Sequence, residues 1–238
     1  MKEKPLGKKS YGSIPHLSDS KLGKSEKKVT IGQERIATCY KRDKHDIIIC
    51  QEKLDGSNVG VAKIDGKIVA LTRAGYLAED SHYELHHVFG RWVIDNISRF
   101  NHVLDDGERI CGEWLYQAHG TKYDLPHEPF VAFDMILGDK RLVFSDLKAK
   151  LCDLFTTPHV INDGESISVR RAMGKLGKYG FHGALEPCEG AVWRVERKGV
   201  VDFLCKYVRP GKVDGKYIID YPETVINTFK PYEKKLDF

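Results

Sequence analysis

The stretch EKLDGSN, residues 52–58, stands between two short apolar runs, 47–51 and 59–64, that have the composition of β-strands. A lysine amine attacks only when unprotonated, so its pKa, about 10.4 in a free peptide, has to be lowered by burial or by neighbouring cations. Gly56 lets the backbone turn sharply and approach a ligand closely. The stretch therefore predicts a nucleophilic Lys53, with a surface lysine before a turn as the plain alternative.

A first hairpin is predicted just after this stretch. Asp65-Gly66 is a strong two-residue turn signal between the strand-like runs 59–64 and 67–73. Partners across such a turn have numbers that sum to 131, so Arg73 falls opposite Asn58. The hairpin thereby returns a cation to the neighbourhood of Lys53, although an ordinary cross-strand arginine fits the same pattern.

A second hairpin is predicted around Lys198-Gly199, between the runs 190–195 and 200–208. If these two residues form the loop, Glu189 opposes Val208 and Lys206 opposes Ala191. Glu189 and Lys206 then project from one face, with backbones roughly 7 to 8 Å apart. The pair suits a metal-bound triphosphate, and it equally suits a simple surface ion pair.

The remaining segments indicate the fold class. Further strand-like runs cover 110–115 and 130–136, and segments 146–155 and 166–176 have helical spacing. A further stripe at helical spacing, expected in the core, consists of Leu85, Val88, Phe89, Trp92, Val93 and Ile97. Strands in hairpins with interspersed helices predict an α+β fold with mainly antiparallel sheets.

Composition and charge indicate the expected domain organisation. The 238 residues contain no internal repeat, and residues 1–28 hold eight lysines and three acidic residues, a charge of +5. We expect a basic N-terminal arm over 1–28, either adding phosphate affinity or forming a flexible, solvated tail, and one domain over 29–238.

The six cysteines have no zinc-ligand spacing and are expected to be reduced and buried. With no signal-peptide-like apolar segment, these features favour a cytoplasmic protein, or a viral protein in the host cytoplasm, without membrane association.

The ordered motifs resemble the covalent nucleotidyltransferase superfamily of ATP-dependent ligases and mRNA capping enzymes, and most closely its RNA ligase 2-like family. The resemblance spans about residues 52–209. Its motifs are matched by residues 53–58, 72–75, 112–116, 130–134, 189–192 and 205–209. The asparagine that ends the first motif, Asn58, resembles RNA ligases more than DNA ligases, which usually have arginine there.

The resemblance implies a nucleotidyltransferase catalytic fold and an ATP-dependent RNA ligase. Such an enzyme joins 5′-phosphate and 3′-hydroxyl ends, as in RNA repair, through a lysyl-AMP intermediate and an adenylylated polynucleotide. ATP and Mg²⁺ or Mn²⁺ are the implied cofactors, and nucleic acid is the implied partner of an expected monomer. The alternatives are a DNA ligase, a GTP-using capping enzyme, or a non-catalytic nucleic-acid-binding relative.

The resemblance also implies residue roles. Lys53 would attack the α-phosphate, Lys206 would bind it, and Glu189 would act in the metal shell, with Asp55 as a further metal ligand. Glu113 would bind ribose and Phe133 would stack on adenine. The implied nucleotide-binding set is Glu52, Lys53, Asp55, Asn58, Arg73, Glu113, Phe133, Glu189 and Lys206. The implied nucleic-acid contacts are Arg73, Asn58, Arg209 and Lys212.

Two departures from the family pattern stand out. The last of these motifs, matched by residues 205–209 and called the fifth motif in the family, commonly has two lysines separated by one residue. Here Leu204 and Cys205 precede the single Lys206, so a phosphate contact is missing or Arg209 replaces it. Only about thirty residues follow that motif, so we expect no appended OB-fold. Substrate grip is then expected from the catalytic domain, the arm or a partner protein.

Overall fold

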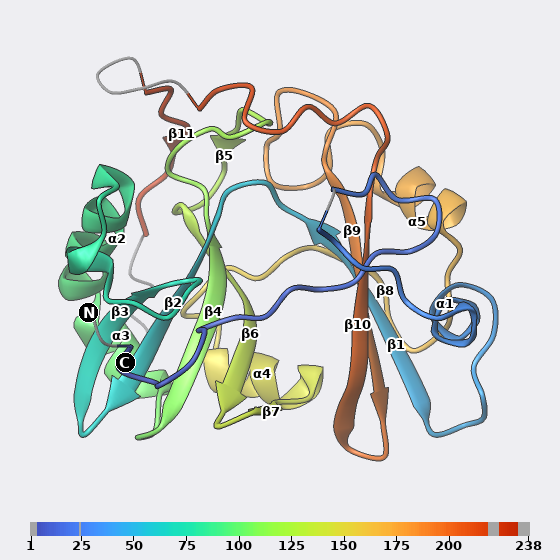
Figure 1. The fold of residues 1–238 in the computed structure, drawn as a ribbon, viewed down its shortest axis with the longest axis horizontal. Helices are drawn as coiled ribbons and strands as arrows, with labels where there is room; N and C mark the ends of the chain where they lie inside the picture. Colours follow the sequence, from blue (N-terminus) through green and yellow to red (C-terminus); the bar gives the residue numbers. More distant parts are fainter. Residues whose placement is uncertain (1–3, 24, 219–223, 233–238) are drawn as a thin grey trace.

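The computed structural model describes residues 4–23, 25–218 and 224–232, and in it two mainly antiparallel sheets stand side by side (Figure 1). One sheet has the order β3-β2-β4-β6-β7 and the other β10-β9-β1-β8. The first consists of β3 (Lys67–Thr72), β2 (Ser57–Ile64), β4 (Glu108–Trp114), β6 (Phe130–Leu137) and β7 (Lys140–Arg141). The second consists of β10 (Val200–Val208), β9 (Gly190–Arg197), β1 (Asp46–Lys53) and β8 (Val160–Asn162). The α+β fold class is confirmed.

A small parallel pair, β5 (Asp124–Leu125) with β11 (Thr228–Phe229), completes the strands of the described residues. Helices α2 (Glu84–Asp95), α3 (Ile97–Val103) and α4 (Phe144–Leu151), with the short 3-10 helix η1 (Ala78–Asp80), lie beside the five-stranded sheet. Helices α1 (Ile31–Thr38) and α5 (Val169–Leu176) lie beside the four-stranded sheet. Each sheet therefore has its own apolar core.

The predicted apolar stripe is confirmed in its middle and wrong at its end. Phe89 and Val93 are buried in the core of the five-stranded sheet, with Val88 and Trp92 packed against it. Ile97 is 45% exposed. The cause is Asn96, whose backbone leaves helical geometry (φ −110°, ψ 16°) and divides the segment into α2 and α3.

The first predicted hairpin is confirmed. Asp65 and Gly66 both have positive φ (50° and 74°), as a two-residue turn of this kind requires. The observed pairs across β2 and β3, from Val59 with Thr72 to Ile64 with Lys67, all follow the predicted register.

The second hairpin has the predicted turn but not the predicted register. Next to the turn Val200 pairs with Arg197 as expected, but a β-bulge at Asp202 shifts the pairing by one residue. Lys206 therefore lies opposite Val192 rather than Ala191, and Val208 lies opposite Gly190 rather than Glu189. A bulge inserts one unpaired residue into one strand, which turn arithmetic cannot anticipate.

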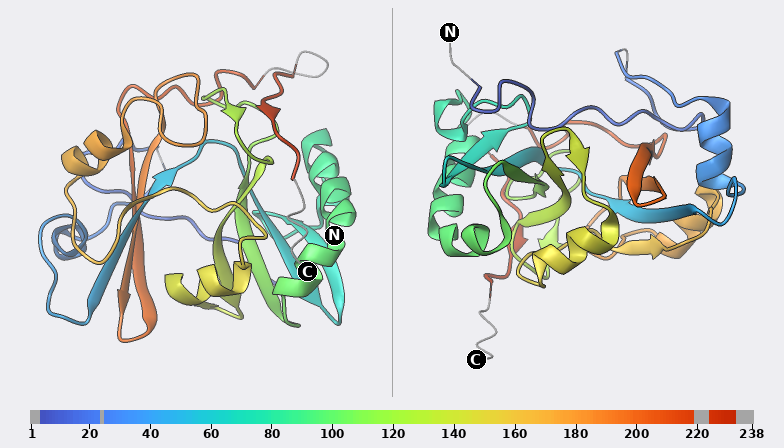
Figure 2. Two further views of the ribbon diagram at one scale, coloured as in Figure 1. Left: turned by 180° about the vertical axis from the view of Figure 1, so that it is seen from behind. Right: turned by 90° about the horizontal axis from the view of Figure 1, so that it is seen from below.

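The N-terminal arm runs across both sheets, as the dark blue segment of Figures 1 and 2 shows. Tyr11 is 4% exposed and Leu17 is fully buried. His16 forms isolated bridges with Lys28 and with Lys206 of β10. The described part of the arm is thus packed against the molecule, where a solvated tail was one of the two expectations; residues 1–3 and 24 lie outside the described residues.

Within the described ranges, no helix has the length and apolarity to cross a membrane. All six cysteines are free thiols. Four are buried as expected, whereas Cys39 and Cys152 are exposed.

Candidate active site

Lys53 is the last residue of β1, where the chain leaves one sheet and enters the other. It pairs with Gly190 of β9, and four residues later Ser57 begins β2 in the five-stranded sheet. The crossing is tight at Gly56, because a Cβ there would lie 2.5 Å from the backbone oxygen of Trp114. Gly56 therefore permits a close approach of this crossing to β4, whereas the predicted approach to a ligand stays a prediction.

The Lys53 side chain is 21% exposed and ends in an ion pair. Its Nζ donates to Glu189 Oε2 at 2.7 Å and to the backbone oxygen of Leu54 at 3.2 Å. Glu113 stands nearby in β4, where its Oε1 accepts from the backbone N–H of Gly56 at 3.0 Å. The amine thus lies at the junction of the two sheets among acidic groups.

The expected lowering of the Lys53 pKa is wrong for this arrangement of side chains. Burial lowers the pKa of the amine, but the negative charges of Glu189, Glu113 and Asp55 outweigh burial and hold the pKa above its usual value. Each nearby carboxylate favours the charged ammonium. Lys53 must therefore lose a tightly held proton before it can act as a nucleophile.

A cavity of about 870 Å³ opens beside Lys53 between the two sheets. Its volume suits a nucleotide-sized ligand. All nine residues expected to bind nucleotide contribute to its lining: Glu52, Lys53, Asp55, Asn58, Arg73, Glu113, Phe133, Glu189 and Lys206. They come from β1, β2, β4, β6, β10 and the segments beside β3 and β9, so the fold brings together positions spread over more than 150 residues of sequence.

Two buried oxygens of the lining have no hydrogen-bond partner within the described structure: Glu52 Oε1 and Asn58 Oδ1. The other carboxylate oxygen of Glu52 accepts from the backbone N–H of Phe181 at 2.9 Å. Burial raises the pKa of Glu52 to about 7, against the opposing effect of that hydrogen bond. Buried polar atoms without partners are rare in folded proteins, so these two are open to a hydrogen-bond donor from a ligand.

An aromatic wall borders the cavity. Phe133 of β6 meets Tyr11 of the arm edge to face, with ring centroids 5.1 Å apart. The Tyr11 hydroxyl donates to Asp134 at 3.1 Å, which fixes the ring. Sequence reasoning missed Tyr11 as a site residue, although Tyr11, Ile14 and Leu17 recur every third position in an otherwise lysine-rich segment.

Lys206 reaches the same cavity through its shifted register. Its Nζ donates to Glu26 Oε1 of the arm at 2.8 Å. Burial opposes the charge on Glu26, but the hydrogen bonds from Lys206 and His16 prevail and lower the pKa of Glu26 to about 2. Arg73, by contrast, is exposed and donates to Ser13 Oγ at 3.0 Å.

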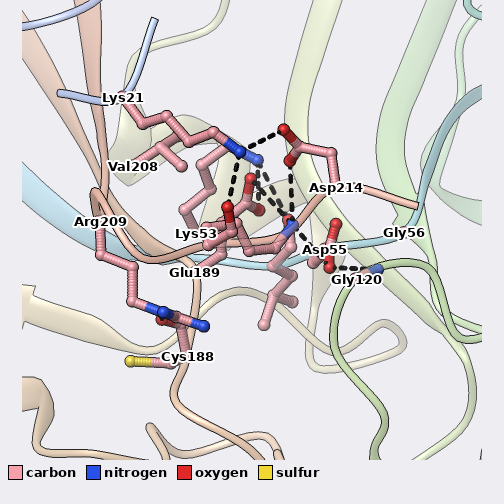
Figure 3. Close-up of polar contacts among 12 residues, drawn as sticks. Lys21, Lys53, Asp55, Gly56, Gly120, Cys188, Glu189, Val208, Arg209 and Asp214 are labelled. Atoms are coloured by element: carbon pink, nitrogen blue, oxygen red, sulfur yellow. Dashed lines mark hydrogen bonds and ion pairs between the residues drawn. The ribbon is translucent and has the colours of Figure 1, made fainter. Parts of the chain in front are cut away.

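Of the two expected nucleic-acid contacts Arg209 and Lys212, the structure corrects Lys212, which is buried, whereas Arg209 is partly exposed. The described lining of the cavity includes neither residue. Arg209 Nε donates to the backbone oxygens of Pro187 and Cys188, so it supports the segment leading to Glu189 (Figure 3). Lys212 is 3% exposed and pairs with Asp55, because the chain after β10 folds inward.

The cavity offers few protein ligands for a divalent cation. In residues 4–23, 25–218 and 224–232, no group of three acidic, histidine or cysteine side chains could hold a metal ion. Asp55 Oδ2 is occupied by Lys212 at 2.8 Å and by the N–H of Gly120 at 2.9 Å, while Glu189 lines the cavity. Such a site fits Mg²⁺, which is typically bound by one or two carboxylates together with substrate phosphates.

Comparisons with known proteins place these observations in context. A family model described as RNA ligase matches residues 46–208. A curated protein of Methanocaldococcus jannaschii, described as uncharacterised, is 26% identical over an alignment of 161 positions, and the match covers 59% of this chain and 37% of that protein.

Two solved structures of Naegleria gruberi RNA ligase variants share the fold. One, titled as a complex with ATP and Mn, has a TM-score of 0.53 at 14% identity and covers 83% of this chain and 61% of that one. The other, titled with AMP and Mn, has a TM-score of 0.52 at 15% identity and covers 87% and 62%. This chain therefore spans less than two thirds of the length of each of these relatives.

Proposed function

The chain belongs to the RNA ligase family, and from that premise we propose that it is an ATP-dependent RNA ligase acting through AMP bound covalently to Lys53. The reaction would join a 5′-phosphate to a 3′-hydroxyl in three transfers. AMP passes from ATP to Lys53, then to the 5′-phosphate, and is released when the 3′-hydroxyl attacks. We propose residues 29–238 as the single domain that carries this chemistry.

The observation that carries the proposal is the convergence of nine expected nucleotide-binding residues on one cavity beside Lys53. In the first transfer, Lys53 Nζ forms a bond to the α-phosphorus and pyrophosphate leaves. One amine proton lies in a hydrogen bond to Glu189 Oε2 at 2.7 Å, and this carboxylate is the basic acceptor in contact with the amine. Lys206, also in the lining, would offset the charge that grows on the phosphate.

The cavity also supports adenine as the base. Glu52 Oε1 is a buried acceptor without a partner among the described residues, and it can accept from the 6-amino group of adenine. Phe133 offers an aromatic face for stacking.

Asp55, Asn58 and Arg73 lie where they could contact ribose and phosphate. A divalent cation, held by Glu189 together with the triphosphate, would neutralise phosphate charge and orient the leaving pyrophosphate. The manganese in the Naegleria structures with ATP and with AMP supports this expectation by analogy.

The decisive experiment is labelling with ATP that carries the label on its α-phosphate. The wild-type protein should acquire one stable label, and Lys53→Arg should acquire none. Arginine keeps the positive charge facing Glu189, but its guanidinium stays protonated near neutral pH and is not a nucleophile. Unchanged thermal unfolding of the variant would show that folding is intact. Label on Lys53→Arg rejects the assignment of the nucleophile.

The substrate is tested separately. Nicked RNA, nicked DNA and single-stranded RNA, each with a 5′-phosphate, should be compared with ATP and with GTP as donor. Sealing of RNA ends with ATP is expected, since the first motif, residues 53–58, ends in an asparagine, as the corresponding motif of RNA ligases does. Preferential sealing of DNA, or use of GTP, would favour the DNA ligase or the capping enzyme. A protein without any label would be a binding relative, in line with the lysine missing from the fifth motif.

A further inference from the structure

Lys212 is a buried lysine that lies just behind the cavity wall. It follows β10 by four residues, and its side chain is only 1% exposed. Its Nζ lies 2.8 Å from Asp55 Oδ2, 3.8 Å from Glu189 Oε1 and 3.5 Å from Asp214 Oδ1. A buried ammonium requires such partners, since an unpaired charge in the interior is strongly destabilising.

The two carboxylates that Lys212 contacts are those of the candidate active site. Glu189 faces a lysine at each oxygen: Oε2 is hydrogen-bonded to Lys53 at 2.7 Å, and Oε1 lies 3.8 Å from Lys212 in a looser ion pair. Asp55 Oδ2 receives both Lys212 and the backbone N–H of Gly120. The rotamers of both acids are thereby limited from the side away from the cavity.

The segment that carries Lys212 is itself fixed. Lys21 of the N-terminal arm donates to Asp214 Oδ2 at 2.7 Å (Figure 3) and to the backbone oxygen of Lys212 at 2.6 Å. Gly120 leaves no spare room, because a Cβ there would lie 2.2 Å from the backbone oxygen of Val213 and 2.9 Å from Lys212 Nζ. Lys212 thus occupies a close-fitting, charged site.

We propose that Lys212 is a positioning residue that holds Asp55 and Glu189 beside Lys53. The inference rests on the proposed function. Without Lys212, the three carboxylates Asp55, Glu113 and Glu189 would face Lys53 alone. Mutual repulsion would move the acids away from the amine. Because displacements of about 1 Å can cost on the order of 100-fold in rate, the transfer of AMP to Lys53 would slow.

The effect should fall on the rate and not on ATP binding, because the described cavity lining does not include Lys212. Lys212→Met keeps the length of the side chain and removes its charge. In single-turnover labelling at several ATP concentrations, we expect the maximal rate of lysyl-AMP formation to fall at least about tenfold. The ATP concentration for half-saturation should stay within about threefold of the wild-type value.

The matched control is Lys41→Met. Lys41 is also an ion-paired lysine, with its Nζ 2.6 Å from Glu165, but it lies outside the cavity lining. It should label at the wild-type rate. Thermal unfolding of both variants shows whether either is destabilised.

A folded Lys212→Met protein that labels at the wild-type rate overturns the inference, as does a loss confined to ATP half-saturation. If Lys212→Met does not fold, Lys21→Met provides the measurement, because it releases the Lys212 segment without burying an unpaired acid. A smaller loss of maximal rate is then expected, and an unchanged rate overturns the inference. A labelled wild type with an unaffected variant rejects this inference alone, whereas an unlabelled wild type rejects the proposed function itself.

Discussion

The end of β1 and the end of β10 both reach the cavity, but they do so by different means. At the end of β1, close backbone approach at Gly56 and pairing of Lys53 with Gly190 fix where the side chains point. At the end of β10, the register beyond the bulge places Lys206 opposite Val192, and Lys212 turns inward to pair with Asp55. A motif defined by backbone geometry can be located from sequence, whereas one defined by side-chain partners requires the folded structure.

The largest effect is expected at the end of β10. Lys206→Met removes a cation from the cavity lining, and loss of one such group should slow lysyl-AMP formation by about 100-fold or more. Single-turnover labelling measures the rate, with exposed Lys67→Met as the control. A loss below about threefold would mean that Lys206 makes no contact with the phosphate. The end of β10 would then not be equivalent to the end of β1.

Gly56→Ala is the corresponding test at the end of β1. The added methyl would lie 2.5 Å from the backbone oxygen of Trp114, so the crossing between the sheets has to move. We expect a loss of about 1–3 kcal/mol in the free energy of unfolding and a roughly 100-fold slower labelling.

The control for Gly56→Ala is Gly174→Ala in α5, where a Cβ meets nothing within 4 Å. That substitution should stabilise the protein by about 0.5–1 kcal/mol, because alanine favours the helix. A Gly56→Ala protein with wild-type stability and rate would show that backbone approach does not position Lys53.

Glu52→Gln measures how much the burial of an ionised carboxylate at the end of β1 destabilises the fold. Burial raises the pKa of Glu52 to about 7, so the folded protein binds this proton more tightly than the unfolded chain does. The resulting stability is fully present below the usual pKa of about 4.5 and is lost as the pH rises through 7. Glutamine does not ionise, so the variant should be more stable than the wild type at pH 8, by up to about 3 kcal/mol.

Urea unfolding at pH 4 and pH 8 tests this expectation. The difference in unfolding free energy between Glu52→Gln and the wild type should shrink as the pH falls below 7 and nearly vanish near pH 4. A variant that is less stable than the wild type at pH 8 would show that the ionised carboxylate is stabilised in the fold.

The smallest effect is expected from deletion of Asp202, the unpaired residue of the bulge. Phe203 already pairs with Val195, so the deletion removes the bulge and leaves Lys206 opposite Val192. The partly exposed ion pair with Arg42 is lost, at a cost of about 1 kcal/mol or less. Labelling should stay close to the wild-type rate; a large loss would mean that the bulge itself positions Lys206.

The sequence predicted the β1 end of the site better than the β10 end for physical reasons. The turn at Asp65-Gly66 requires positive φ at both positions, which few residues adopt, and this fixed the predicted pairing of β2 with β3. The bulge at Asp202 and the break at Asn96 have no comparable local signature. Helix α1 was not predicted, although Thr30 and Gln33 form a capping box at its start.

The candidate site shows the same division. The nine side chains assigned to nucleotide binding through ordered motifs all reach the cavity, because those motifs follow strands of known direction. Lys212 was misplaced because the destination of a lysine in a loop depends on which acids the fold brings near it. The pKa of Lys53 was predicted in the wrong direction for the same reason, since it depends on Glu113 and Glu189 from distant strands.

The arm that crosses the sheets has a further consequence for how the molecule behaves in concentrated solution. Strand β10 is the outermost strand of its sheet, and the arm covers its outer side with hydrogen bonds between Lys206 and both Pro15 and Leu17, and between Val208 and Lys21. An uncovered strand of this kind invites pairing with a second chain. A protein trimmed to begin at α1 would present that row of free amides and carbonyls and would tend to self-associate.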